Sequence, residues 1–189
     1  VAIALAVSLV PVTAALWQPA QAAAGDLDPA FGTGGIADAA PSLGSFDPQD
    51  QVLQPDGKIV VVGGTGTGSS QNTVMARFMP DGSLDPTFGT GGVREVNFVT
   101  GQRDLAVSVA IANDGKIVIG GNRYDQPNFL AYVARFAANG QGAPEVNIDY
   151  GIPTYTLGGH IALLPGAPGA QQILLGMWNE STRITVYKL

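Results

Sequence analysis

The stretch DGSLDPTFGTGG, residues 81–92, decides the fold because parts of it occur again in the chain. LDPAFGTGG at residues 27–35 matches LDPTFGTGG at residues 84–92, and the two phenylalanines, Phe31 and Phe88, lie 57 positions apart. A long motif that returns at a regular distance is typical of a repeat architecture. The stretch therefore predicts a chain built from repeated structural units.

Two further landmarks recur at nearly the same distance. DGKIVVVGG at residues 56–64 returns as DGKIVIGG at residues 114–121, and Ala-Arg-Phe at 76–78 returns at 134–136, each 58 positions on. Landmarks that share an offset indicate a duplicated unit rather than chance matches. We expect units at about 27–84, 85–146 and 147–189, within one domain at 25–189.

The third unit is eroded. QILLG at 172–176 continues the aliphatic series, and Lys188 stands where Arg77 and Arg135 stand. GAPGAQ at 166–171 replaces the Asp-Gly turn. We expect Tyr150-Gly151 to replace Phe88-Gly89, with Asn147 in place of the motif aspartate, displaced by an insertion around residues 140–144.

Composition predicts an all-β chain. The 26 glycines and 13 prolines punctuate short runs rich in β-branched and aromatic residues. The net charge of −6 and the lack of a Lys/Arg-rich block exclude the basic surface that nucleic-acid binding needs, so no nucleic-acid partner is expected. With no cysteine, neither a disulfide framework nor a thiolate metal site is available.

The N-terminal segment predicts export. Residues 1–24 carry no charge and run from an apolar stretch, too short for a comfortable membrane span, into the small residues AQAAA. This pattern indicates a signal peptide, residues 1–24, whose positive n-region is missing. The cleavage site follows Ala22 or Ala24. We expect a secreted, periplasmic or cell-surface protein without a transmembrane helix after cleavage; a retained membrane anchor or a buried apolar segment is the alternative.

Four strands are expected in the middle unit, at about 92–98, 105–112, 116–122 and 129–136. Asp56-Gly57 and Asp114-Gly115 supply the positive φ angles of tight hairpins, so the strands on either side of each turn should pair antiparallel. Ile59 to Val62 is apolar at every position, which predicts sheets covered on both faces. The expected fold is therefore all-β, with three repeats of four-stranded antiparallel blades in a partial or open β-propeller.

These motifs resemble a known family. LQPDGKIVVVGG, ARFMPDGSLDPTFGTGG and IANDGKIVIGG are similar to the delta-60 repeats of bacterial exported and surface proteins. The resemblance covers nearly all of the chain after Gly25 and implies a propeller-like repeat fold. It carries no catalytic residues to transfer, and no catalytic or cofactor-binding residue is predicted.

The repeated residues are expected to be structural. A buried Arg77 needs a partner, and Asp85 or Asp81 is the nearest candidate. Phe31 and Phe88 should fill the core, and the glycines should hold unusual backbone angles. The structural repeat positions are Asp28, Phe31, Gly32, Asp56, Gly57, Arg77, Asp85, Phe88, Gly89, Asp114, Gly115 and Arg135.

Alternative chemistries receive less support. Asp26, Asp28, Asp81 and Asp85 could bind calcium, but their spacing does not follow a calcium-loop motif, so no cofactor is expected. His160 is the only histidine, and no G-x-S-x-G motif accompanies it. An enzyme, such as a propeller hydrolase or lactonase, would instead need polar residues that converge on a central axis.

A binding or protein-interaction module is the expected function, with an unknown protein or carbohydrate as ligand. The loops 64–73, 122–128 and 140–146 should form its face, with Arg123 and Tyr124 as surface contacts. Closed propellers have about four to eight blades, so three blades imply a truncated fragment, additional blades from a longer chain, or a homo-oligomer. In a closed assembly, Asp28 and Phe31 should dock against a strand at residues 186–189.

Overall fold

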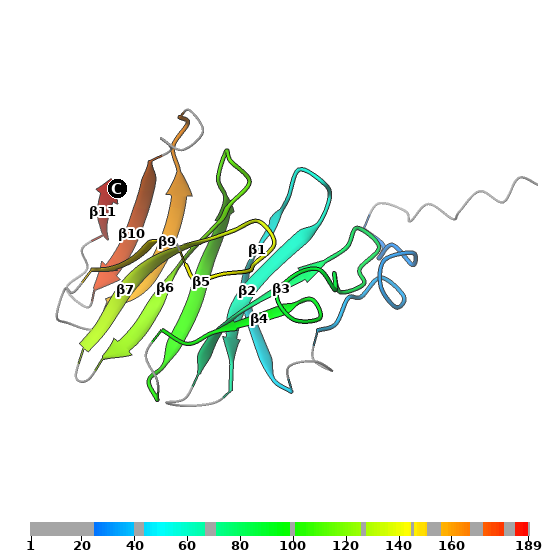
Figure 1. Ribbon diagram of the computed structural model, residues 1–189, viewed down its shortest axis with the longest axis horizontal. Helices are drawn as coiled ribbons and strands as arrows, with labels where there is room; N and C mark the ends of the chain where they lie inside the picture. The colour runs from blue at the N-terminus through cyan, green and yellow to red at the C-terminus, as the bar shows by residue number, and fades with distance from the viewer. Residues whose placement is uncertain are drawn as a thin grey trace, which may run out of the picture.

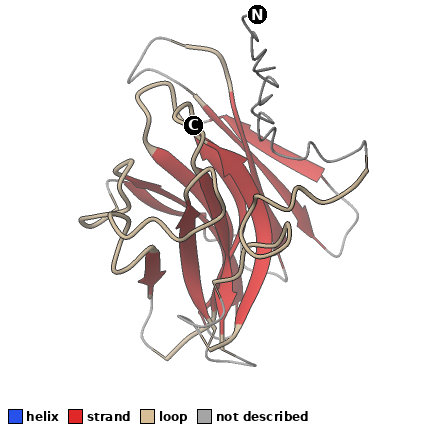
Figure 2. Cartoon of the chain, turned by 90° about the vertical axis from the view of Figure 1, so that its right-hand side faces the viewer, coloured by secondary structure: helices blue, strands red, loops and turns tan. Residues whose placement is uncertain are grey.

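All the regular structure described for this protein is β-strand. The computed structural model describes residues 25–39, 44–66, 71–98, 101–125, 128–144, 146–150, 156–166, 172–179 and 184–188. Figure 2 shows strands and loops only along this part of the chain. The expected all-β fold is therefore confirmed, and the N-terminal residues 1–24 lie outside the described residues.

The strands form three antiparallel sheets that lie side by side in chain order (Figure 1). The first sheet has the order β1-β2-β3-β4, the second β5-β6-β7-β8 and the third β11-β10-β9. The strands are β1 (Phe46–Leu53), β2 (Ile59–Thr65), β3 (Asn72–Phe78), β4 (Val93–Val96), β5 (Asp104–Ile111), β6 (Ile117–Asp125), β7 (Asn128–Phe136), β8 (Val146–Tyr150), β9 (Thr156–Leu163), β10 (Ile173–Asn179) and β11 (Ile184–Lys188).

The Asp-Gly turns form the hairpins expected from the sequence. Leu53 pairs with Ile59 across the first turn, and Ile111 pairs with Ile117 across the second. Gly57 and Gly115 adopt φ angles of 83° and 81°, in the left-handed region where glycine avoids the Cβ penalty. These turns set the register of the first two strands in each of these sheets.

One strand joins a different sheet from the one expected. The sequence predicts that residues 92–98 belong to the same sheet as the three strands that follow, but β4 pairs with β3, with Val93 opposite Ala76. The 79–92 loop turns the chain back along β3, so its following strand closes the first sheet. Each four-stranded sheet therefore begins with the strand before its Asp-Gly turn. It ends with the strand that follows the long loop after its third strand.

The assignment of Tyr150 and Asn147 also changes. Both lie in β8, where Asn147 pairs with Ala134 as Val93 pairs with Ala76 in the first sheet. They therefore match the fourth strand and do not replace Phe88 or the motif aspartate. The second unit has a shorter connection between Phe136 and Val146 instead of an insertion, while Gly151 lies outside the described residues.

The sheets pack face to face through apolar side chains. The first and second sheets enclose one core, in which Val62 and Met75 face Ile119 and Phe136. The second and third sheets enclose another, which includes Val118 and Leu175. The other side of the first sheet packs under residues of the N-terminal segment, among them Ala39. The strand at 59–62 is thus fully covered on the face of Val60 and Val62, whereas Ile59 and Val61, on the other face, are half-buried.

The three loops expected to form one binding face lie at different ends of the sheets. Residues 64–73 and 122–128 connect the second strand of a sheet to the third. Residues 140–146 connect the third strand to the fourth. Because successive strands run antiparallel, these connections fall at opposite ends, and the expected common face is wrong.

Candidate functional site: the joints between successive sheets

The FGTGG loops fold identically at both of their positions. Gly35 N–H donates to Phe31 O, and the equivalent Gly92 N–H donates to Phe88 O, both at 2.9 Å. The glycines at each step of the two loops also have similar positive φ angles, such as 57° at Gly32 and 53° at Gly89. The repeated sequence therefore specifies one local structure twice.

Each of these loops docks on the turn that follows β3 or β7. Gly32 N–H donates to Asp81 O at 2.7 Å, and Gly89 N–H donates to Asn139 O at 3.3 Å. Asp81 and Asn139 occupy the same place in successive units, 58 positions apart. We call each pairing of an FGTGG loop with the next turn a joint: the first involves residues 31–35 and 81–83, and the second involves residues 88–92 and 139–141.

Both joints need glycine in the receiving turn. A Cβ on Gly82 would lie 2.5 Å from Gly32 N, and a Cβ on Gly140 would lie 2.5 Å from Phe88 Cε2. Phe88 is fully buried in the core between the first and second sheets, whereas Phe31 is half-buried. The phenylalanine of the second joint is thus more deeply buried than that of the first.

A buried ion pair stabilises the second joint. Of the two carboxylates considered for Arg77, Asp85 is the partner: Arg77 Nη2 and Nε lie 2.9 and 3.0 Å from Asp85 Oδ2. Arg77 Nη1 donates across the joint to Ala138 O at 2.6 Å, and the guanidinium stacks on the Phe88 ring at 4.7 Å. Arg77 therefore connects its own sheet to the next one.

The surroundings of Asp85 favour its charged form. Burial raises the pKa of this carboxyl, but the Thr87 hydroxyl and N–H, together with Lys58 and Arg77, outweigh burial and hold the pKa well below its ordinary value. Lys58 Nζ lies 3.1 Å from Asp85 Oδ2, and the Thr87 hydroxyl donates to Oδ1 at 2.6 Å. Both oxygens of this carboxylate are therefore used in contacts that stabilise the fold.

The second unit uses a different partner for its arginine. Arg135, the equivalent of Arg77, binds Asp114 in the Asp-Gly hairpin. Burial raises the pKa of Asp114, but the Arg135 hydrogen bond, the Lys116 N–H and both positive charges lower it overall. The shorter connection after Phe136 lacks the Leu-Asp-Pro motif, so the hairpin supplies the aspartate instead.

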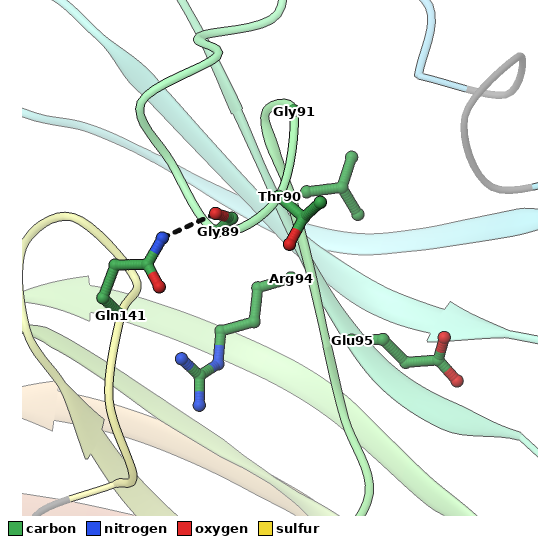
Figure 3. Close-up of a pocket in the computed structure, with 7 residues that line it drawn as sticks. Gly89, Thr90, Gly91, Arg94, Glu95 and Gln141 are labelled. Atoms are coloured by element: carbon green, nitrogen blue, oxygen red, sulfur yellow. Dashed lines mark hydrogen bonds between the residues drawn. The ribbon is translucent and has the colours of Figure 1, made fainter.

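A hollow opens beside each joint. Beside the second joint it measures about 580 Å³ and is lined by Gly89, Thr90, Gly91, Val93, Arg94, Glu95 and Gln141 (Figure 3). Beside the first joint it measures about 810 Å³, and its lining includes Gly32, Thr33, Ile36, Ala37, Asp38 and Ser83. Each of these six residues lies 57 or 58 positions before its equivalent in the other hollow. The repeat therefore creates the same hollow twice.

The polar side chains differ between the two hollows. Beside the second joint, Arg94 donates to Gly140 O and Gly142 O and stacks over Phe136 at 5.0 Å. Gln141 donates to Gly89 O, as the dashed line in Figure 3 shows. In the other hollow Ala37 replaces Arg94 and Asp38 replaces Glu95. The second hollow thus carries both charge signs, and the first is acidic.

A second set of links between sheets has no sequence motif. Asp50 follows a β-bulge in β1, and its Oδ2 accepts the N–H of Val109 in β5 at 2.8 Å. Ser108 follows the equivalent bulge in β5, and its hydroxyl accepts the N–H of Ile161 in β9 at 3.3 Å. The residue types differ, so no motif marks them. Their separation of 58 positions was the available signal.

His160 occupies the same place in the third sheet. It lies opposite Gly176 beside a register shift, as Ser108 lies opposite Gly120 and Asp50 lies opposite Val62. Aspartate, serine and histidine thus line up on three neighbouring strands, although not as a catalytic triad. A triad places the imidazole between the serine and the acid, whereas here serine occupies the middle strand and its hydroxyl accepts a backbone N–H.

The aspartates considered as alternative calcium ligands make other contacts in the structure. Asp85 already binds two cationic side chains, and Asp81 Oδ1 accepts the N–H and hydroxyl of Ser83. Asp28 Oδ1 accepts the Ala30 N–H. Within the described ranges, no three His, Cys, Asp or Glu residues gather in a geometry that could hold a metal.

Arg123 and Tyr124 lie at the end of β6 that leads into its hairpin with β7. Both are half-buried, and the Tyr124 N–H donates to Arg103 O at 2.7 Å. The Tyr124 backbone therefore fastens this hairpin to the segment before β5. The described residues contain no helix that is long and apolar enough to cross a membrane.

Stacked antiparallel sheets with repeated joints define this chain as an all-β, propeller-like repeat protein. A family model described as "Domain of unknown function (DUF5122) beta-propeller" matches residues 54–88 and 112–141. The two matched segments start at equivalent places in successive units, two residues before each Asp-Gly turn. The match supports a β-propeller-type repeat family. No curated protein matches the chain.

Proposed function

We propose that this chain is an exported scaffold of delta-60 repeats that works as a protein-interaction module. The observation that carries the proposal is the repeated hollow, because equivalent residues open the same space beside both joints. Repeat proteins commonly bind partners through equivalent surfaces on successive units. The N-terminal segment supports a secreted, periplasmic or cell-surface location.

The lining of the hollows favours a polypeptide partner. Glu95 and Gln141 are exposed, and the glycine-rich loops bring backbone polar groups to the surface. Small-molecule sites are mostly enclosed and apolar, whereas mixed polar rims are typical of protein interfaces. Charged side chains of an extended peptide would pair with Arg94 and Glu95, and these contacts would set its orientation.

Selection of peptides from a displayed random library tests the proposal. Peptides enriched on the wild-type chain should lose about tenfold affinity, roughly 1.4 kcal/mol, on Glu95→Lys. Pro55→Lys, at an exposed position on the first Asp-Gly hairpin, is the matched control and should leave affinity within about twofold. Peptides that bind both variants equally, or no enrichment at all, would refute this site.

A further inference from the structure

The first sheet ends on a strand whose outer edge is unpaired among the described residues. In the order β1-β2-β3-β4, β4 pairs with β3 on one side only. Val93 O accepts the Thr90 N–H at 2.7 Å, and Val93 N–H donates to Thr90 O at 3.3 Å, so the backbone groups of Val93 face away from β3. Because these groups alternate in direction along an antiparallel strand, those of Arg94 face β3. The N–H and C=O of Glu95 therefore face outward, where they bond with no described residue.

The hollow beside the second joint lies over this outer edge. Successive side chains of a strand point to opposite faces of its sheet. Arg94 stacks on Phe136 of the second sheet, whereas the Glu95 carboxylate, on the other face, accepts a hydrogen bond from Asn72. Figure 3 shows the Arg94 and Glu95 side chains extending to different sides of their strand. A hollow lined by both side chains therefore wraps around the edge of β4.

The edge of β4 lies along the side of the stack, because the sheets pack through their faces (Figure 1). Further sheets at either end of the stack would leave it uncovered. The second sheet has an equivalent edge at β8, but no FGTGG loop precedes that strand. Ile148 stands there opposite Val133, as Arg94 stands opposite Met75. The loop and the arginine therefore distinguish the edge of β4.

Arg94 brings a positive charge without a countercharge to this edge. Its guanidinium donates to the neutral carbonyls Gly140 O and Gly142 O, and no carboxylate among the described residues lies within ion-pair distance. Burial lowers the pKa of Arg94, and no nearby carboxylate offsets this effect. A guanidinium has five N–H donors, so others remain after these two bonds. A carboxylate on a partner would supply the missing charge through a charge-assisted hydrogen bond.

We propose that an extended segment of the partner pairs with the outer edge of β4 as a fifth strand of the first sheet; this inference rests on the proposed interaction module. The backbone of the segment bonds with the N–H and C=O of Glu95, in the mode called β-augmentation. In an antiparallel pair, the residue opposite Glu95 directly precedes the residue opposite Arg94. Cross-strand charge pairing then requires Lys or Arg followed directly by Asp or Glu in the segment.

A second copy of this chain does not fit the same edge. Two β4 strands paired antiparallel through the outward groups of Glu95 would bring the two Glu95 side chains directly opposite each other, and like charges in that position are destabilising. The strand is also only four residues long and carries two charges, features that protect natural sheets from indiscriminate pairing. The edge therefore selects a segment of another protein by its charges.

Proline substitution separates backbone pairing from side-chain contacts. The probes are peptides enriched on the wild-type chain from the displayed random library. Glu95→Ala and Glu95→Pro both remove the carboxylate, but only proline also removes the outward N–H. Edge strands tolerate proline where this N–H faces solvent. The peptides should bind the proline variant about tenfold more weakly than the alanine variant. Equal affinities would overturn the proposal and leave the interaction module in place.

Amide hydrogen exchange of the wild-type chain gives a readout that does not depend on how a variant folds. A saturating enriched peptide should slow exchange of the Glu95 N–H by about tenfold or more, because this group gains a bond in the added strand. The Arg94 N–H already faces β3, so its exchange should slow several-fold less. A Glu95 rate that the bound peptide leaves unchanged, or equal slowing at both positions, overturns pairing at this edge.

The sequences of the enriched peptides test the charges. Peptides selected on the wild-type chain should carry the basic-acidic dipeptide, and those selected on Arg94→Gln should lose the preference for the acid. Arg94→Lys is the matched control, because it keeps the charge and should keep that preference. Enrichment without an acidic residue, or an acid preference that survives Arg94→Gln, overturns the assignment to Arg94. No enrichment at all overturns both this inference and the interaction module.

Discussion

Gly140 packs against the ring of Phe88 across the second joint, and a Cβ at this position would lie 2.5 Å from Phe88 Cε2. The same loop is fastened by the Gly89 N–H, which donates to Asn139 O. The turn after β7 therefore accommodates the loop after β3, and this fit requires a glycine, which has no Cβ, at position 140.

Gly140→Ala should destabilise the fold by about 2–4 kcal/mol, because a left-handed backbone strain adds to overpacking against a buried ring. Gly142→Ala is the matched control, since Gly142 has a similar φ angle of 78° but no atom within 4 Å of an added Cβ. Its cost should be about 1 kcal/mol, from backbone strain alone. Urea unfolding measures both, and equal losses would contradict a tight joint.

The repeated motifs were sufficient to predict the hairpins, the stacked sheets and an aspartate partner for Arg77, but not the docking of each FGTGG loop on the next turn. They could not predict which sheet β4 joins, because a turn motif fixes only the strands on either side of it. The links from Asp50 and Ser108 were also hidden, since each needs only an acceptor at a bulge and two different residue types can provide one. Tyr150 was misplaced because a shortened loop and an insertion look alike when the motif has decayed.

A further link between the first two sheets joins two buried hydroxyls. Thr73 Oγ1 and Tyr132 Oη lie 2.7 Å apart in β3 and β7, and burial raises the pKa of Tyr132 far above its ordinary value. Tyr132→Phe should cost about 1–2 kcal/mol because it leaves the Thr73 hydroxyl buried without this partner.

The double variant Thr73→Val with Tyr132→Phe should cost less than the sum of the single variants, because neither hydroxyl is then left without the other. A double-mutant cycle by chemical denaturation measures this coupling. Strictly additive losses would mean that the two hydroxyls do not stabilise the stack together.

The Arg77–Asp85 pair predicts how the stability of the fold depends on pH. The pKa of Asp85 is lower in the folded chain than its unfolded value of about 3.9, so the carboxylate stabilises the fold fully above that value. Its contribution is lost progressively as the pH falls from about 4 towards the folded pKa. Asp85→Asn should therefore cost about 2–4 kcal/mol at neutral pH and flatten the stability profile below pH ~4.

Asp81→Asn is the comparison for this variant. Asp81 is exposed and its pKa is lowered by the Ser83 hydroxyl and N–H. Its loss should be much smaller than that of Asp85 at every pH. Thermal unfolding across the acid range would separate the two, and matching profiles would refute the buried pair as the source.

A further prediction concerns Asp50 and Ser108, because each uses a different side chain to accept a backbone N–H from the next sheet. Asp50→Ala should cost about 1–3 kcal/mol, since the Val109 N–H loses its acceptor in a partly buried place. Asp50→Ser should recover part of that loss, because serine makes the equivalent bond in the second sheet. Asp47→Ala, an exposed position on the same strand, should stay within about 0.5 kcal/mol. Denaturant titration of the three variants measures the order, and a serine variant no more stable than the alanine variant would show that the two bulges are not interchangeable.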